Sequence, residues 1–331
     1  MATRRKIVFP DGDDATLEMF KGEQLARVGK LGEFTCYPNA PDTAEEYLNR
    51  IGDAEAILLG WGLPDDVLVR APKLELIAFT GVGAANFVNL NIATQNGITV
   101  TNTPGYADDT VAEHTMALML DSVRHVSRLD RDTRKGGWYK GLPGFDLKGR
   151  TLGLIGLGGI GSRVSHMAQA FGMRVIAWTR NPSPERAASA GVEFKDLETI
   201  LSESDVLSLH LALTPDTENM LNAGNFKKLK RGAVLINTAR AEIIDETALL
   251  SALENGSISA AGLDVFHDEP LPPEHPLRTL ENVVLTPHTG FNTPEATSRI
   301  MDIAVDSLAA YFSGNPINVI AAPTQQDLRT P

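Results

Sequence analysis

Short apolar runs alternate with segments of helical spacing over the first hundred residues. The apolar runs predict strands at 7–9, 34–37, 56–59, 74–79 and 98–101. Apolar positions three or four residues apart predict helices at 15–28, 42–50 and 64–70. Strands that alternate with helices in this way favour a parallel sheet covered on both faces.

A longer helical pattern follows at 110–131, with apolar positions that predict a helix buried over much of its surface. Segment 131–150 is predicted to be irregular, because it holds five glycines, one proline and the aromatic residues Trp138, Tyr139 and Phe145. A loop of this length is uncommon inside a compact domain. We therefore expect either an arm held by a second subunit or a packed surface loop.

From residue 151 the alternation starts again and is more regular. It predicts strands at 151–155, 174–178, 205–209, 232–237, 258–263 and 282–285, a helix at 162–171 and a last helix at 294–312. The fold class expected is α/β, with two doubly wound parallel-sheet domains and a cleft between them. We expect a substrate domain of residues 1–103 and 293–331, and a dinucleotide-binding domain of residues 104–292.

Composition and charge narrow the function. The 331 residues include 30 basic and 42 acidic side chains, a net charge of −12, which argues against nucleic acid or an anionic membrane as partner. The single cysteine, Cys36, excludes an intramolecular disulfide, and no histidine pair has the spacing of a metal site. The first apolar run ends at Pro10, and none approaches the roughly 20 residues of a membrane span. We expect a cytoplasmic protein without a metal.

The segment 151–172 has the pattern of a dinucleotide-binding turn. A predicted strand leads into Gly156, Gly158 and Gly161, and a predicted helix follows. In such a turn the first glycine permits the sharp bend, the second lets a pyrophosphate approach the backbone, and the third lets helix and strand pack closely. The helix N-terminus then faces the anion.

The choice between NAD and NADP is made at the end of the next strand, where an NAD site usually has an acid for the ribose 2′-hydroxyl. Here Thr179 stands in that place, Arg180 follows, and the first acid is Glu185. Arg180 can pair with a 2′-phosphate. We therefore favour NADP, while NAD beside a solvated Arg180 stays possible.

Three further motifs follow predicted strands, and they contain Arg240, Glu269 and His288. In open parallel sheets ligands bind beyond the carboxyl ends of the strands. An arginine there can hold the carboxylate of a 2-oxo acid and polarise its carbonyl. A histidine can donate a proton as hydride arrives, and a neighbouring carboxylate favours the charged imidazole and fixes its tautomer.

The chain resembles the D-isomer-specific 2-hydroxyacid dehydrogenase family in motifs that occur in one order, namely 102–106, 110–114, the glycine turn, 236–240, 262–266 with 269–270, and 286–288. The resemblance implies that Arg240, Glu269 and His288 are the catalytic residues. It implies that Asp264 binds the nicotinamide carboxamide and that the backbone of Gly81, Val82 and Gly83 binds the substrate carboxylate. The residues expected to bind the cofactor are, in all, Thr110, Gly156, Gly158, Gly159, Ile160, Gly161, Thr179, Arg180, His210, Thr238, Ala239 and Asp264. The residues expected to bind the substrate are Val82, Gly83, Arg240 and His288.

The same resemblance implies a homodimer formed through the cofactor domains, with the segment 131–150 embracing the second subunit. It makes glyoxylate and hydroxypyruvate the leading substrates. The chain departs from the family at Ala84–Asn86, where an acid is frequent, and at Ala212 and Ala241, where proline and glycine are usual. His114 is assigned a structural role.

Three other functions stay open. A formate-type oxidation needs no acid–base pair, so Glu269 and His288 disfavour it. A phosphoglycerate-type enzyme would be expected to carry a regulatory tail, and the sequence ends at Pro331. A nucleotide-sensing interaction module that acts as a corepressor would bind the cofactor without turnover.

Overall fold

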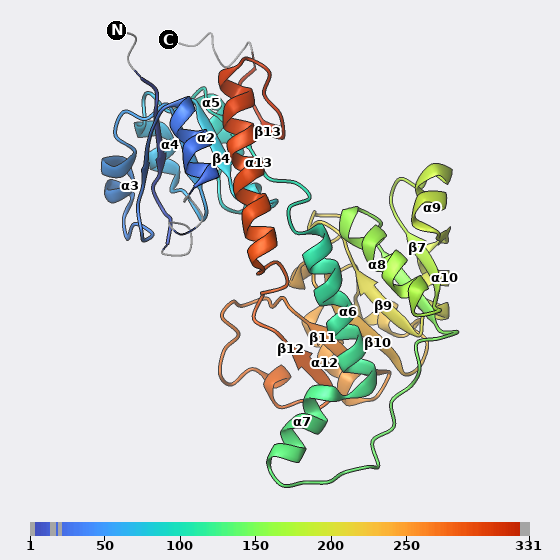
Figure 1. The fold of residues 1–331 in the computed structure, drawn as a ribbon. Coiled ribbons are helices and arrows are strands. Elements are labelled where there is room, and N and C mark those ends of the chain that lie inside the picture. Colours follow the sequence, from blue (N-terminus) through green and yellow to red (C-terminus); the bar gives the residue numbers. More distant parts are fainter. Residues whose placement is uncertain (1–3, 14–17, 19–21, 325–331) are drawn as a thin grey trace. The chain divides into compact units, whose positions relative to one another are not determined.

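The chain folds into two compact units, each built on one β-sheet (Figure 1). The computed structural model describes residues 4–13, 18 and 22–324. The first unit comprises Met1–Tyr106 together with Thr293–Pro331, and the second comprises Ala107–Asn292. The prediction of two α/β parallel-sheet domains is confirmed, with one antiparallel strand in the first of them.

The sheet of the first unit has the order β13-β5-β4-β3-β1-β2. Its strands are β1 (Lys6–Phe9), β2 (Glu33–Cys36), β3 (Ala56–Leu59), β4 (Leu76–Phe79), β5 (Thr99–Thr101) and β13 (Val319–Ala321). The first five are parallel, but β13 pairs antiparallel with β5, so the expectation of a purely parallel sheet is wrong at this edge. The hydrophobic pattern did not predict β13, because it is three residues long and lies exposed at the edge.

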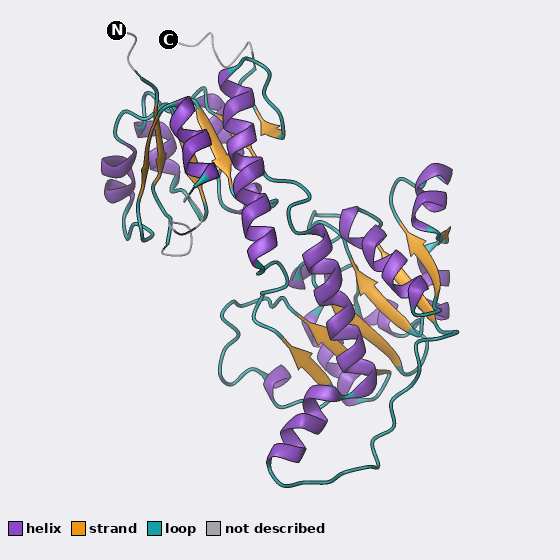
Figure 2. Ribbon diagram, in the orientation of Figure 1, coloured by secondary structure: helices purple, strands orange, loops and turns teal. Residues whose placement is uncertain are grey.

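Alternate side chains of these strands point to opposite faces of the sheet, and each face has its own helices (Figure 2). Ile57 and Ile77 pack with the helices α3 (Ala44–Ile51), α4 (Asp65–Arg70) and α5 (Leu90–Gln95). Ala56 and Leu58 pack on the other face, with α2 (Glu23–Leu31) and α13 (Pro294–Phe312).

The described part of α2 differs from the helix expected at 15–28. Residues 15–17 and 19–21 lie outside the described residues, and from Glu23 the helix continues through Gly29 to Leu31. The expected end at residue 28 is therefore wrong. The helix stops at Gly32, where a Cβ atom would lie 2.5 Å from the carbonyl oxygen of Arg5.

The second unit contains a seven-stranded parallel sheet of order β12-β11-β10-β9-β6-β7-β8. Its strands are β6 (Thr151–Ile155), β7 (Arg174–Trp178), β8 (Glu193–Phe194), β9 (Val206–Leu209), β10 (Ala233–Asn237), β11 (Ile258–Leu263) and β12 (Val283–Leu285). The central strands are apolar and buried at nearly every position, as expected when helices cover both faces of a parallel sheet.

Helices α6 (Asp108–Arg124) and α8 (Gly159–Ala170) pack on one face of this sheet. Helices α10 (Leu197–Glu203), α11 (Ala223–Phe226) and α12 (Glu246–Glu254) pack on the other. The helix α9 (Pro184–Ala190) follows β7. None of the helices within the described ranges is both long and apolar enough to cross a bilayer.

The single helix expected at 110–131 is two helices. α6 ends at Arg124, His125 has a left-handed backbone with φ of 58°, and α7 (Val126–Arg134) begins in a new direction. The backbone amide of Ser127 donates to Asp121 Oδ1 at 2.8 Å, which satisfies one of the free amides at the start of α7. The irregular segment therefore begins at Lys135, not at 131, and it runs to β6 (Figure 1).

Candidate active site

The glycine turn after β6 meets the geometric needs of a dinucleotide site. Gly156 has a φ of 102°, and a Cβ atom there would overlap the carbonyl oxygen of His210 at the end of β9. A Cβ atom at Gly161 would lie 2.5 Å from the carbonyl oxygen of Gly156. Both positions therefore require glycine for the turn itself.

At position 158 neither a positive φ nor a steric overlap of the Cβ atom requires glycine. Its φ is −82°, and a Cβ atom there would meet no described protein atom within 4 Å. The open space lies directly before α8, which begins at Gly159 rather than at the expected Ser162. Free backbone amides before open space at the start of a helix fit the pyrophosphate of a dinucleotide.

Two arginines, Arg180 and Arg186, have contacts near the end of β7, where a dinucleotide-binding domain recognises the ribose. Arg180 Nη2 donates to Asp216 Oδ2 at 2.8 Å in an exposed ion pair. Arg186, on α9, donates to the carbonyl oxygens of Leu157 and Asn181, the latter at 3.0 Å. It thus links the glycine turn to the end of β7. Arg186 is not evident from the sequence motifs, because it lies within a helix, away from any strand-end motif.

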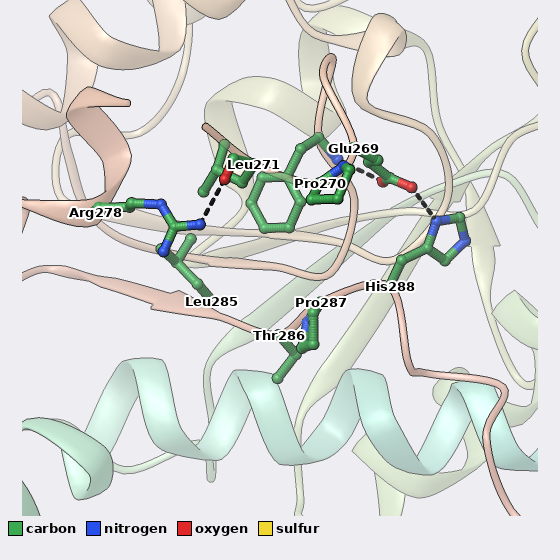
Figure 3. Close-up of a pocket in the computed structure, with 9 residues that line it drawn as sticks. Glu269, Pro270, Leu271, Arg278, Leu285, Thr286, Pro287 and His288 are labelled. Carbon is green, nitrogen blue, oxygen red and sulfur yellow. Dashed lines mark hydrogen bonds and ion pairs between the residues drawn. The ribbon is translucent and has the colours of Figure 1, made fainter. Parts of the chain in front are cut away.

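Glu269 and His288 form a hydrogen-bonded pair (Figure 3). His288 Nδ1 lies 2.7 Å from Glu269 Oε2, and the other carboxylate oxygen accepts a hydrogen bond from the amide of Phe266 at 2.9 Å. The side chains are 40% and 37% exposed for His288 and Glu269, so substrate can reach them. Because Nδ1 faces the carboxylate, Nε2 is the ring atom free to exchange a proton with a ligand.

The pair lies beside a cavity of about 550 Å³ with mainly apolar walls. Phe266 contributes to the lining. The side chains of Leu271 and Leu285 do so as well (Figure 3). Arg278 lines it too, and its Nη2 donates to the carbonyl oxygen of Leu271 at 2.5 Å. An apolar cavity with a few polar groups at one side is typical of a small-molecule site.

Asp264, at the end of β11, is 2% exposed and holds the loop that carries His288. Its Oδ1 accepts hydrogen bonds from the hydroxyl of Thr286 at 2.6 Å and the amide of Thr289 at 3.0 Å. Its Oδ2 accepts one from the amide of Gly290 at 2.9 Å. Asp264 thereby fixes the chain on both sides of His288, which has a left-handed backbone with φ of 51°.

His114, on α6, completes this network. Its Nε2 lies 2.9 Å from Thr286 Oγ1 and 3.3 Å from Asp264 Oδ1. Burial by itself raises the pKa of the Asp264 carboxyl, but the hydrogen bonds from His114, Thr286 and the two amides outweigh it and hold the pKa below its ordinary value. Asp264 is therefore charged at neutral pH. His114 therefore contacts Thr286 and Asp264, two residues that hold the loop of His288.

The remaining expected residues of the second unit lie at the ends of β7, β9 and β10 and on α6 and α8. Asn237 Nδ2 donates to the carbonyl oxygen of Arg240 at 2.9 Å, and Arg240 Nη1 donates to that of Ala239 at 2.6 Å. Thr238 Oγ1 lies 2.9 Å from Thr115 Oγ1. Burial lowers the pKa of His210 to about 4, so its ring is neutral at pH 7. Ile160 lies in the first turn of α8, and Thr110 in the first turn of α6.

Val82 and Gly83 belong to the first unit, in the loop after β4. Asn102 Nδ2 donates to the carbonyl oxygen of Val82 at 2.9 Å, and the amide of Thr103 donates to that of Gly81 at 3.0 Å. These bonds fix the loop at the carboxyl edge of the first sheet. Val82 is 54% exposed there.

Comparison with known proteins agrees with this fold. Residues 116–290 match the model of the D-isomer specific 2-hydroxyacid dehydrogenase NAD binding domain. The chain is 40% identical to a glyoxylate reductase of Aeropyrum pernix over 291 residues, which are 85% of this chain and 87% of that protein. It is 38% identical to a glycerate dehydrogenase of Methylorubrum extorquens over 330 residues, or 96% and 99%.

Among solved structures, an NADPH-dependent glyoxylate/hydroxypyruvate reductase from Sinorhizobium meliloti superposes with a TM-score of 0.82 at 31% identity. The match covers 96% of this chain and 98% of that one. The fold and the site thus define a dehydrogenase with a Rossmann-type domain. The chain belongs to the D-isomer specific 2-hydroxyacid dehydrogenase family.

Substituting the buried carboxylate tests its role in holding the His288 loop. Asp264→Asn replaces one acceptor oxygen with an amide that faces a backbone N–H. Hydrogen bonds to charged groups contribute about 1.5–3 kcal/mol, so we expect the free energy of unfolding without cofactor to fall by about that amount. Denaturant unfolding measures it. The control is Asp268→Asn, a neighbouring exposed acid. Equal stability of the two variants would contradict the role.

Proposed function

We propose that this protein reduces a small 2-oxo acid to the D-2-hydroxy acid with NAD(P)H, with glyoxylate and hydroxypyruvate as the leading substrates. The observation that carries the proposal is the contact between His288 Nδ1 and the Glu269 carboxylate, at the same sheet edge as the glycine turn. The names of the relatives support the choice of substrate, since they include a glyoxylate reductase and a glycerate dehydrogenase.

The reaction needs one proton from the protein. When bound, the nicotinamide supplies the hydride that adds to the carbonyl carbon, while the π electrons of the C=O bond move to its oxygen. His288 donates its Nε2 proton to that oxygen, and in the reverse direction it removes the proton from the hydroxyl. Glu269 holds Nδ1–H, which keeps Nε2 toward the substrate and stabilises the protonated ring.

The other site residues bind and orient. Arg240 would pair with the substrate carboxylate and polarise the carbonyl, for which a planar guanidinium is well suited. In the first unit, we assign the backbone amides of Val82 and Gly83 to the binding of a substrate carboxylate. The pyrophosphate would lie at the glycine turn and the carboxamide at Asp264. The further residues we assign to the cofactor are Thr110, Gly159, Ile160, Thr179, Arg180, His210, Thr238 and Ala239.

Removing the imidazole tests the acid–base assignment. General acid–base catalysis contributes about 10²–10⁴-fold, so His288→Ala should lower kcat for 2-oxo acid reduction by about that factor. The dissociation constant of the cofactor should not change. The matched control is His166→Ala, because His166 is a histidine on an exposed face of α8. Glu269→Gln should lower kcat as well, because Nδ1–H loses its charged acceptor and the ring loses its orientation. Near-normal turnover by His288→Ala would contradict the assignment.

We further propose that NADP(H) is the preferred cofactor. The end of β7 carries Thr179 and Arg180 and no acid before Glu185, and Arg186 adds a second guanidinium. The Arg180–Asp216 pair is exposed, and such pairs contribute only about 0–1 kcal/mol, so Arg180 can turn to a 2′-phosphate at small cost.

The cofactor preference can be measured directly. We expect kcat/KM to be about tenfold or more higher with NADPH than with NADH, since a charge-assisted contact contributes about 1.5–3 kcal/mol. Thr179→Asp combined with Arg180→Ala should reverse the order, because the new acid binds the ribose diol and repels a 2′-phosphate. A clear preference of the unmodified enzyme for NADH would contradict the proposal.

We also propose a homodimer formed through the second unit. α7 buries none of its residues, and Val126, Trp138 and Tyr139 are 58%, 78% and 57% exposed. Exposed apolar groups on one segment are typical of a protein interface. Sedimentation should give the mass of two chains, and Trp138→Asp should shift it toward one. Leu25→Asp, an exposed apolar residue of the first unit, is the control. A single-chain mass for the unmodified protein would contradict the dimer.

A further inference from the structure

Two histidines on the loop between β11 and β12 have contacts that the proposed chemistry does not use. His275 Nε2 lies 3.1 Å from Glu246 Oε1, and the two side chains are 12% and 32% exposed. His267 Nε2 lies 3.1 Å from the carbonyl oxygen of Ile244. Both histidines thus join the loop to residues 244–246, which lead into α12. Because Glu269 lies between the two histidines, this short segment supports the loop on both sides of Glu269.

The contacts of the His275 ring determine where its proton lies. Its Nδ1 accepts a hydrogen bond from the amide of Leu277 at 3.3 Å, which caps the short 3₁₀ helix Pro276–Arg278. A ring nitrogen that accepts an N–H carries no proton, so in the neutral ring the proton is on Nε2 and is donated to Glu246. One ring atom therefore holds the loop together, and the other fastens it to α12.

The chain between Glu269 and His275 is folded onto the same short helix. The carbonyl oxygen of Pro272 accepts hydrogen bonds from the amide of His275 at 3.1 Å and from Arg278 Nε at 2.8 Å. Arg278 Nη2 donates to the carbonyl oxygen of Leu271 (Figure 3). A movement of His275 is therefore passed to the backbone next to Glu269.

The helix α12 is a firm support for this loop. Its N-cap residue, Asp245, accepts a backbone amide of the first turn at 3.1 Å. Leu249 of α12 and Leu277 of the loop are 4% and 2% exposed and belong to one apolar core. Glu246 is the first residue of α12, one short connection after Arg240. The contact between His275 and Glu246 therefore links the loop of the proposed substrate arginine to the loop of Glu269, within one unit.

We propose that His275 is a positioning residue for Glu269, and that Glu246 is its anchor on α12. The pair fixes the loop so that Glu269 Oε2 meets His288 Nδ1. The inference rests on the proposed function and deepens it, because it names the groups that keep the proton-transfer pair assembled. A displacement of about 1 Å, caused by a change away from the reacting atoms, can cost roughly 10²-fold in rate.

Two replacements separate the two contacts of the His275 ring. His275→Asn keeps an acceptor near the place of Nδ1 but loses the donor to Glu246. His275→Gln keeps a donor near the place of Nε2, so it can still reach Glu246. We expect His275→Asn to lower kcat for 2-oxo acid reduction by about 10–100-fold, and His275→Gln to retain most of the activity.

Glu246→Ala removes the anchor from the other side and should lower kcat as His275→Asn does. Its matched control is Glu254→Ala, which removes an exposed carboxylate from the same helix. The matched control for His275→Asn is His166→Asn, on the exposed face of α8. The dissociation constant of the cofactor should be the same in all variants, since the loop lies outside the glycine turn.

A double-mutant cycle shows whether the effect passes through Glu269. It compares kcat, at saturating cofactor and 2-oxo acid, for the unmodified enzyme, His275→Asn, Glu269→Gln and the double variant. If His275 positions the Glu269 carboxylate, His275→Asn costs much less in the presence of Glu269→Gln, because the contact that it protects is already weakened.

A merely structural role of His275 gives a different result. In that case His275→Asn lowers kcat by the same factor with and without Glu269→Gln, which overturns the inference. Because Glu246 is partly exposed at the start of a helix, Glu246→Ala decides the question in the same cycle if His275→Asn does not fold. Unchanged kcat in His275→Asn and Glu246→Ala overturns the inference while the proposed function stands. No turnover of any 2-oxo acid by the unmodified protein overturns the proposed function, and this inference with it.

Discussion

Parallel pairing of the strands is the constraint on which the candidate site depends. Each strand of the second sheet is followed by a connection that returns to the opposite edge, so every carboxyl end lies at one edge. The glycine turn, the loop with Arg240, Asp264 and the loop with His288 all begin there. Glu269 and His288 are 19 residues apart in sequence and come into contact because β11 and β12 are neighbours.

In each unit a buried carboxylate fixes a loop by accepting hydrogen bonds from its backbone amides. Asp264 follows β11 and Asp11 follows β1, and each accepts two backbone amides from a neighbouring loop. Their pKa shifts differ because the number of donors differs. Asp264 also receives the Thr286 hydroxyl and contacts His114, and these contacts outweigh burial, whereas burial prevails at Asp11. A fully bonded buried carboxylate fixes one loop conformation, since any other would leave it unpaired.

The hydrophobic pattern was sufficient for the buried elements. The strands predicted at 151–155, 174–178 and 258–263 and the helix at 294–312 have the bounds found in the structure, because long apolar or periodic runs determine them. The break at His125 was missed because the helical period continues on both sides of a single left-handed residue. β13 was missed because its apolar run is short and lies exposed at the edge of the sheet.

For the candidate site, strand-end position identified Glu269 and His288, whose contact the structure shows. Strand-end position could not identify residues whose role depends on contacts with residues far away in the sequence. His114 is 172 residues from Thr286, and Arg186 reaches Leu157 across 29 residues from within a helix. Asp11 and Trp61 are 50 residues apart, and neither lies in a motif. Such pairs depend on which strands become neighbours, and the periodicity of one segment carries no information about that.

The groups of the two units are held by separate sets of hydrogen bonds. The Glu269–His288 pair and the glycine turn belong to the second unit, while the loops after β3 and β4 belong to the first. The first sheet holds those loops by bonds of its own, from Asp11, Asn102 and Thr103. A change of side chain at Trp61 or Val82 therefore leaves the hydrogen bonds of Glu269, His288 and Asp264 in place. Loops on a rigid scaffold can differ in this way without loss of the fold. Loops of the first unit can therefore differ among proteins of one fold while the strand-end groups of the second unit keep their hydrogen bonds.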